Sequence, residues 1–304
     1  MTRIVVGGDF CPVSHMESLA GNAPQCVWGD SLGLLRSAAL RIINLECPLT
    51  SRGHRIVKAG PHLRSAPAAV NALAYASIDV VTLANNHIMD YGPEGLRDTL
   101  EVCRSHGIET VGAGFTPAAA GRVLYRQSAD HRLAIVNLCE NEWSVAREGG
   151  PGANGIDLAE DYYCIQEAAR QADIVLVIVH GGHEGYPYPS PRMVKQYHFY
   201  VDAGAAVVVC HHAHCVSGYE IHRDRPIFYG LGNLLFPSEA PPGGWSRGMF
   251  LALELARRGE MSWDLIPYRQ CASAATGIEL LPARDPRINV LITAAHFLFL
   301  FNSS

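Results

Sequence analysis

The sequence predicts an α/β protein in which two mixed sheets pack face to face with helices on the outside. In the first two thirds of the chain, strand-like and helix-like segments alternate, which is typical of a largely parallel sheet. The last third is almost entirely strand-like, with the spacing of hairpins. Polar Asp, Glu, Asn and His residues follow several apolar segments, at the ends of strands where α/β sheets gather ligands.

The expected strands are short apolar runs rich in β-branched residues, each bounded by turn-forming residues. In chain order they are Ile4–Gly8, Arg41–Leu45, Val80–Leu83, Glu109–Val111, Arg122–Tyr125, Leu133–Leu138, Ile174–Val179, Ala206–Cys210, Gly218–His222, Pro226–Gly230, Met249–Leu255 and Ser262–Pro267.

Four helices are expected between these strands. Ser65 with Pro67 is typical of a helix start, and that helix should continue to about Ser77. Pro93 opens a second helix that ends near His106, before a glycine. The third and fourth helices should cover 158–171 and 190–204.

Length and composition predict one domain over residues 1–285, followed by an apolar segment over 286–304 that docks on it. The hydrophobic content of 48% is ordinary for a globular protein. The net charge is −5, only 17% of residues are charged, and we see the arginines as scattered rather than clustered. Nucleic acid is therefore not expected as a partner, whereas a homo-oligomer is compatible with the sequence.

The cysteines and the chain ends favour a cytoplasmic protein. The nine cysteines form no C-x-x-C pair, and several lie inside expected strands or helices. No apolar leader precedes the first strand. The run Val290–Phe301 is shorter than the roughly 20 residues of a membrane span. We expect it to be a final strand or helix, with a membrane- or partner-facing tail as the alternative.

Three histidines within four positions are the strongest chemical signal in the sequence. His211, His212 and His214 directly follow an apolar strand. In an extended chain residues i and i+2 point the same way, so His212 and His214 should reach one cation together. His211 should point elsewhere and act as an outer group or a base.

Two carboxylates end the first two strands. Asp9 follows two glycines that permit a close approach of backbone or ligand. Glu46 alternates with Leu45, which places it on the same side as Asn44. Facing Asp9 from a neighbouring strand, Glu46 could bridge two cations.

Further candidate ligands follow the third and the seventh strand. In the Asn85-Asn86-His87 segment, Asn85 suits a turn, Asn86 offers an amide oxygen, and His87 is a candidate acid or base. Asp90 could orient that imidazole. His180 ends a buried strand and is followed by two glycines, and Glu184 beyond them could contact substrate.

The ligand types predict one or two divalent ions. Asp, Glu, Asn and His without convincing Cys ligands suit Mn²⁺, Zn²⁺ or Fe²⁺ rather than a structural zinc site. The number of candidates would satisfy a pair of ions about 3.5–4 Å apart. We therefore expect a metalloenzyme.

The motifs, in their order, resemble the CapA family, named for a poly-γ-glutamate capsule protein, within the calcineurin-like metallophosphoesterase superfamily. They are Gly8-Asp9, Asn44-Leu45-Glu46-Cys47-Pro48-Leu49, Ala84-Asn85-Asn86-His87 with Asp90-Tyr91-Gly92, Gly112-Ala113-Gly114, His180-Gly181-Gly182-His183-Glu184, His211-His212-Ala213-His214 and Tyr229-Gly230-Leu231-Gly232-Asn233. The resemblance covers roughly residues 3–236. One departure is Cys11, which stands where the superfamily's first motif has histidine.

The resemblance implies a four-layer α/β/β/α sandwich with a metal site at one rim. Carried over by motif, the metal positions are Asp9, Glu46, Asn86, His180, His212 and His214. Residues Asp9, His87 and His211 are the candidate catalytic groups. Asp90, Glu184, Asn233 and Arg64 would then contact the ligands or the substrate.

The preferred function is metal-dependent chemistry on a peptide or poly-γ-glutamate-like substrate, whose carboxylate or carbonyl the metals would bind. A hydrolase would cleave an amide or ester with His87 as proton donor. An α-epimerase, of the kind that tailors lasso peptides, would exchange the Cα proton between two bases. The alternatives are a phosphoesterase and a non-catalytic subunit of a glutamyl polymer synthesis complex.

Overall fold

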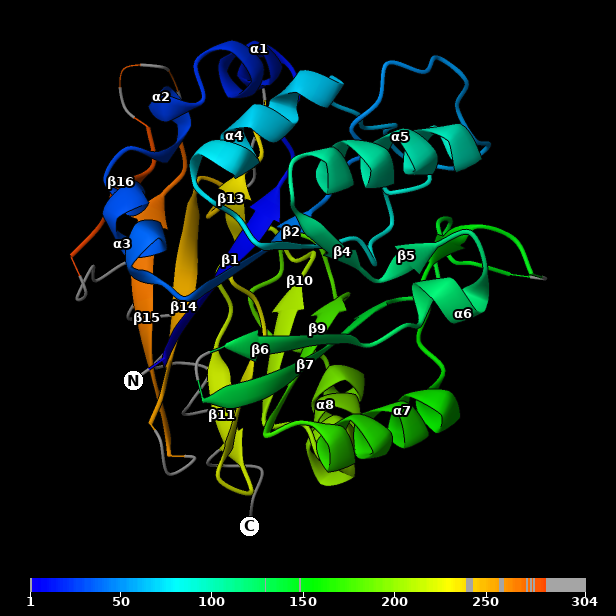
Figure 1. The fold of residues 1–304 in the computed structure, drawn as a ribbon, viewed down its shortest axis with the longest axis vertical. Helices are drawn as coiled ribbons and strands as arrows, with labels where there is room; N and C mark the ends of the chain where they lie inside the picture. Colours follow the sequence, from blue (N-terminus) through cyan, green and yellow to red (C-terminus); the bar gives the residue numbers. More distant parts are fainter. Residues whose placement is uncertain are drawn as a thin grey trace.

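The structure is a computed structural model that describes residues 2–282, apart from 129, 148, 239–242, 257–259, 272, 274 and 276. The expected C-terminal segment 286–304, including Val290–Phe301, lies outside the described residues. Two large sheets form the centre, and helices cover the outer face of each (Figure 1).

The first sheet has eight strands in the order β16-β15-β14-β1-β2-β3-β4, with β13 paired to β1. Strands β1 to β4 are parallel, and β14 to β16 extend the sheet by antiparallel pairing. Their bounds are β1 Thr2–Phe10, β2 Leu40–Leu45, β3 Val80–Thr82, β4 Glu109–Val111, β13 Asn233–Leu235, β14 Arg247–Leu255, β15 Met261–Arg269 and β16 Glu279–Leu280.

The second sheet has six strands in the order β11-β12-β10-β9-β7-β6, and β5 pairs with β8 in a separate ribbon. Strands β7, β9, β10 and β12 are parallel, with antiparallel strands at both edges. The bounds are β5 Ala113–Gly114, β6 Leu124–Ser128, β7 His131–Cys139, β8 Gly152–Ala153, β9 Ile174–His180, β10 Val207–His211, β11 Tyr219–His222 and β12 Arg225–Phe228.

The helices form the two outer layers. Helices α1, α2, α4 and α5 lie on the side of the first sheet, whereas α7 and α8 lie on the far side of the second (Figure 1). Their bounds are α1 His15–Asn22, α2 Gln25–Trp28, α3 Ser31–Ser37, η1 Pro67–Ala69, α4 Val70–Tyr75, α5 Gly92–Ser105, α6 Pro117–Ala120, α7 Leu158–Gln171 and α8 Pro191–Ala203.

Alternation along the strands creates three apolar cores, and these define four layers. Ile4 and Val6 face the second sheet, whereas Val5 between them packs toward the helices of the first. On the second sheet, Leu176 contributes to the core between the sheets and Val177 to the core beneath α7 and α8. Because successive side chains point to opposite faces, a strand buried on both sides must be apolar throughout. This confirms the predicted four-layer α/β/β/α sandwich.

The structure corrects several details. The helix expected from Ser65 begins as a 3₁₀ turn at Pro67 and ends at Tyr75, and the Ser65 hydroxyl donates to the Pro12 carbonyl instead. The helices α1 to α3 were not expected. The strand expected from Leu133 begins earlier, at His131, which is buried.

Candidate metal centre

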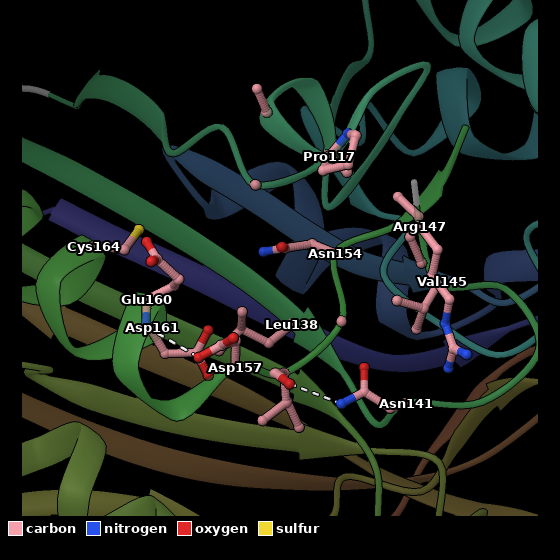
Figure 2. A pocket seen from close by; sticks show the side chains of 17 residues that line it. Pro117, Leu138, Asn141, Val145, Arg147, Asn154, Asp157, Glu160, Asp161 and Cys164 are labelled. Atoms are coloured by element: carbon pink, nitrogen blue, oxygen red, sulfur yellow. Dashed lines mark hydrogen bonds between the residues drawn. The ribbon is translucent and has the colours of Figure 1, made fainter. Parts of the chain in front are cut away.

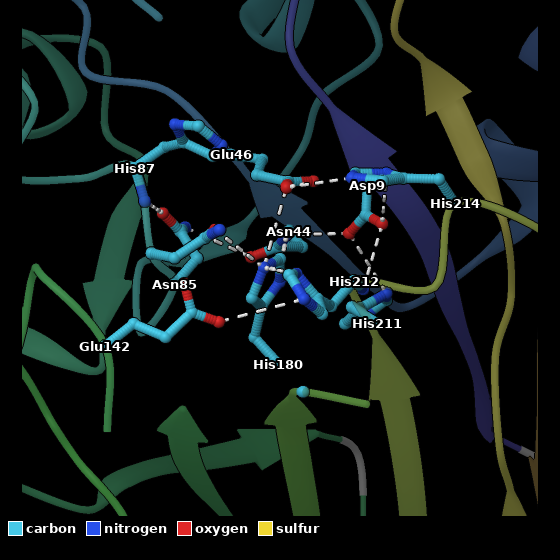
Figure 3. Close-up of polar contacts among 12 residues, drawn as sticks. Asp9, Asn44, Glu46, Asn85, His87, Glu142, His180, His211, His212 and His214 are labelled. Atoms are coloured by element: carbon cyan, nitrogen blue, oxygen red, sulfur yellow. Dashed lines mark hydrogen bonds and ion pairs between the residues drawn. The ribbon is translucent and has the colours of Figure 1, made fainter. Parts of the chain in front are cut away.

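Polar residues from both sheets meet where their parallel strands end (Figure 3). Asp9 lies near the end of β1 and Glu46 directly follows β2, while His180 and His211 are the last residues of β9 and β10. The pairing of parallel strands sets their positions, since Asp9 is in register with Asn44, and His211 with His180. The structure therefore brings the expected strand-end residues together.

Asp9 is fully buried, and its two carboxylate oxygens accept hydrogen bonds from different sheets. Oδ1 accepts a 2.7 Å hydrogen bond from Nδ2 of Asn44, on the neighbouring strand. Oδ2 accepts a 3.2 Å bond from the backbone N–H of His212. The glycine before it is required, because a Cβ on Gly8 would lie 1.9 Å from the carbonyl oxygen of Gly232. The close approach predicted from the glycines is therefore between the backbones of Gly8 and Gly232.

Glu46 is buried, and neither carboxylate oxygen has a hydrogen-bond partner. Its Oε1 lies 3.5 Å from Nε2 of His180 and 3.5 Å from Nε2 of His214. A buried carboxylate without a donor is costly, and a bound cation would offset that cost.

His180 is held from two sides. Its Nδ1 lies 3.2 Å from the Asn44 amide nitrogen, and its Nε2 lies 3.1 Å from Oδ1 of Asn86. The same Nε2 is 3.1 Å from Nδ1 of His212. Asn44, which bonds both Asp9 and His180, was named from the sequence only as a neighbour of Glu46.

The triple-histidine segment lies in the site for a different reason from the one expected. His212 and His214 have φ angles of 87° and 53°, so the chain after β10 is not extended. A left-handed conformation is costly for residues other than glycine, and such strain is common at functional sites. His211 does not point away, because its Nδ1 is 3.5 Å from Oδ1 of Asp9. Both of its ring nitrogens are buried without a hydrogen-bond partner.

His214 is positioned by Asn233 and by two aromatic rings. Its Nδ1 lies 2.9 Å from Oδ1 of Asn233, whose amide nitrogen donates to the carbonyls of His214 and Trp245. The imidazole also packs against Phe236 and Trp245, with centroids 5.0 and 4.6 Å away. The expected proximity of Asn233 to the site is therefore seen.

The Asn85-Asn86-His87 segment turns sharply after β3. Oδ1 of Asn85 accepts hydrogen bonds from the backbone N–H groups of His87 and Ile88, so Asn85 is the turn former that its sequence context predicts. Nδ1 of His87 lies 2.7 Å from Oδ2 of buried Asp90, as expected for a carboxylate that orients an imidazole. Lys58, which the sequence analysis missed, pairs with Oδ1 of Asp90 and lies 3.1 Å from Nδ1 of His87.

Burial shifts the pKa values of these groups toward their neutral forms. It raises the pKa of Asp9 to about 7. Burial, and then the nearby charges of Asp9 and Glu184, hold the pKa of Glu46 well above its usual range. Burial also lowers the pKa of His211 and of His214 to about 3. Neutral imidazoles are the form that binds metals.

Two groups of side chains have ligand atoms close enough to hold an ion. They are Glu46, His212 and His214, and Asp9, Glu46 and His180, with ligand atoms within 4.8 Å of one another in each group. Glu46 belongs to both groups. The carboxylate oxygens of Glu46 have no hydrogen-bond partner, and a donor set of carboxylates and imidazoles fits a divalent ion.

Some expected contacts lie further out. Glu184 is exposed and influences Glu46 only through its charge. The Arg64 guanidinium bonds the Arg52 carbonyl and lies over the Tyr91 ring, 4.7 Å from its centroid, rather than in the cluster. Glu142, which was not expected, approaches His212 with 3.8 Å between Oε1 and Nε2.

The arginines are less scattered than the sequence analysis held. Residues 51–64 contain four Arg or Lys and two His but no Asp or Glu. This run of basic residues was a signal available in the sequence.

A separate cavity of about 720 Å³ is lined in part by the segment from Asn141 to Arg147 (Figure 2). Its lining includes Asn141, Asn154, Asp157, Glu160 and Asp161, with Arg147 as the one basic residue. Residues of the metal-ligand groups do not line it.

Solved structures share this architecture. A phosphatase from Mycoplasma pneumoniae aligns with a TM-score of 0.55 over 89% of this chain and 94% of its own, at 14% sequence identity. A hypothetical protein from Thermus thermophilus aligns with a TM-score of 0.53 over 88% and 100%, also at 14% identity. At such identities the likeness shows the fold alone.

Curated relatives are closer in sequence. The PGA biosynthesis protein CapA of Bacillus subtilis (strain 168) is 30% identical over 231 residues, which cover 74% of this chain and 60% of that protein. The capsule biosynthesis protein CapA of Bacillus anthracis is 30% identical over 68% of this chain, but over only 51% of its own length. A probable polyglutamine synthesis accessory protein of Mycobacterium tuberculosis (strain ATCC 25618 / H37Rv) is 33% identical over 86% of this chain and 71% of its own.

No helix in the described part of the chain has the length and apolar character needed to traverse a bilayer. The family model described as bacterial capsule synthesis protein PGA_cap matches residues 3–238, which contain all the strand-end motifs. The chain therefore belongs to the PGA_cap family.

Proposed function

We propose that this protein is a metal-dependent enzyme that acts on a peptide or a poly-γ-glutamate-like chain. One observation carries the proposal: Glu46 lies buried and unpartnered between His180 and His214 and is shared by both candidate ligand groups. The motif resemblance to the poly-γ-glutamate capsule family, together with the name of the Bacillus subtilis relative as a PGA biosynthesis protein, supports the glutamyl class of substrate.

The ligands we propose are Asp9, Glu46, Asn86, His180, His212 and His214. Each is buried or nearly so, and they come from both sheets. Divalent Mn, Zn or Fe bound there would supply Lewis acidity toward a carboxylate or carbonyl of the substrate. Glu46 is the residue best placed to serve two ions.

Proton transfer is assigned to His87. With Nδ1–H donating to Oδ2 of Asp90, the other ring nitrogen, Nε2, is left to exchange a proton with the substrate. Asp90 also pairs with Lys58 through its other carboxylate oxygen, Oδ1. Asp9, itself a proposed ligand, and His211, whose Nδ1 lies 3.5 Å from Oδ1 of Asp9, complete the proposed catalytic group.

The deciding experiment compares metal content and turnover in wild-type protein and Glu46→Gln. We expect wild type to bind at least one ion per chain and the variant to lose ions from both groups. A variant with unchanged metal content would overturn the assignment.

Incubation of metal-loaded protein with glutamyl peptides in D₂O then separates the two proposed chemistries. Deuterium entering Cα without cleavage selects epimerisation, and cleavage with the mass gain of water selects hydrolysis. Rapid turnover of an aryl phosphate with Mn²⁺ would favour the phosphoesterase instead. Absence of turnover with full metal content would favour an accessory subunit, as the name of the mycobacterial relative suggests.

A further inference from the structure

The loop between β2 and η1 is a basic segment that is tied to the candidate site. Residues 51–64 carry Arg52, Arg55, Lys58 and Arg64 in a chain whose net charge is −5. The loop lies beside α5 (Figure 1), where Thr50 and Arg52 bond Asp98. Ser51 to Arg55 are exposed.

Asp90 fastens this loop at three points. Its backbone carbonyl accepts a 3.1 Å hydrogen bond from the Ile56 N–H, and its Oδ2 accepts a 2.7 Å bond from the Leu63 N–H. Its Oδ1 pairs with Lys58, whose side chain is only 2% exposed. Because Oδ2 of Asp90 also contacts His87, the loop and the proposed proton-transfer residue share one anchor.

Two guanidinium groups of this loop lie near one aromatic ring and are not paired with a carboxylate. Arg55 and Arg64 lie over Tyr91, at 6.0 and 4.7 Å from the ring centroid. In the part of the chain that the structure describes, neither forms an ion pair, whereas Arg52 is paired with Asp98. Like charges gathered beside a site, with no acidic residue among residues 51–64, favour an anionic ligand.

We propose that Arg55 and Arg64 form a carboxylate-binding site that selects an anionic peptide chain as the substrate. This inference rests on the proposed function and names the residues that would confer specificity. Guanidinium groups bind carboxylates through paired N–H donors. The Tyr91 ring packs against both guanidinium groups and so orients them. The cavity of Figure 2 is less suited to such a chain, because Asp157, Glu160 and Asp161 line it.

The test measures binding of a dye-labelled γ-linked glutamyl oligomer to the metal-loaded full chain by fluorescence anisotropy. We expect Arg55→Gln and Arg64→Gln each to weaken binding about tenfold, as for the loss of a charge-assisted hydrogen bond. A weaker dependence of affinity on NaCl should accompany this loss. Arg64→Lys keeps the charge but not the fork, and should fall between wild type and Arg64→Gln.

Arg170→Gln is the matched control, because it removes the same charge from α7, where Arg170 pairs with Glu167. It should bind like wild type. The proposal is overturned if the loop variants bind like this control, if wild type does not bind the oligomer, or if inorganic phosphate competes as well as a glutamyl carboxylate does.

Metal content and turnover are measured on the same samples. Unaltered binding by the loop variants in a protein that holds metal and turns over a peptide would refute this inference alone. Failure of wild type to take up metal would refute the proposed function.

Discussion

The two sheets contribute different chemistry to one site. The first sheet supplies oxygen atoms, from Asp9 and Glu46, and burial raises the pKa of both carboxyl groups. The second sheet supplies imidazoles, from His180 and the segment after β10, and burial lowers their pKa values. Each sheet thus presents groups whose charged form is disfavoured by the same low-dielectric surroundings. A divalent ion would resolve this for both sheets at once and hold their ends together.

The largest expected effect comes from removing one ligand from either sheet. We predict that Asp9→Ala and His212→Ala each strip bound metal, measured by elemental analysis, because both sheets contribute to the ligand groups. His131→Ala should retain it, since His131 lies at the opposite end of β7 from the site. Equal metal content in all three variants would contradict the two-sheet site.

Removing the His87 imidazole should lower the rate of turnover without changing the metal content. We expect His87→Ala to lower kcat by about 100- to 10,000-fold, the usual contribution of a general acid or base, with metal content unchanged. The control is His106→Ala, an exposed residue just after α5. A parallel loss of metal in His87→Ala would make His87 a ligand and not a proton donor.

A smaller effect should come from the residue that orients a second-sheet ligand. Asn233→Ala removes the contact to Nδ1 of His214, and we expect metal affinity to fall about 10- to 100-fold. The control is Asn71→Ala, which removes a hydrogen bond between α4 and the Gly21 carbonyl of α1, in the helical layer of the first sheet. If both variants titrate alike with Mn²⁺, Asn233 serves folding alone.

The smallest expected effect is the release of protons on metal binding, which we expect from the first sheet and not from the second. In the metal-free protein the raised pKa values leave Asp9 and Glu46 partly or wholly protonated at neutral pH, whereas the histidines are neutral. Ion uptake should therefore release about one or two protons, all from the first sheet, and affinity should rise as the pH rises through about 7. A pH indicator in weak buffer measures the release, and Glu46→Gln should diminish it. Release unchanged in that variant would point to a different source.

Much of the site could be predicted because its residues end strands. Apolar runs located β1, β2, β9 and β10, and parallel strands end at one edge, so Asp9, Glu46, His180 and His212 were expected to converge. Lys58 could not be predicted in this way. It reaches Asp90 from a loop whose path depends on hydrogen bonds by Ile56 and Leu63.

Local periodicity was also an unreliable guide to side-chain direction outside regular strands. Alternation correctly placed Asn44 and Glu46 on one side, because β2 is extended up to Leu45. The same rule predicted that His212 and His214 would reach one cation, and both belong to one candidate ligand group, but their positive φ angles show that the chain there is not extended. These angles are maintained by tertiary contacts, among them the bond from the His212 N–H to Asp9.

The sequence by itself determined the layered fold and the types of ligand, because hydrophobic periodicity and residue chemistry are local properties. Only the tertiary structure decided that Glu46 would lie without a donor between imidazoles of the other sheet, and that a basic loop would be fastened to Asp90. Both depend on which surfaces bury one another. Burial is what turns ordinary carboxyl and imidazole groups into a site that favours a cation.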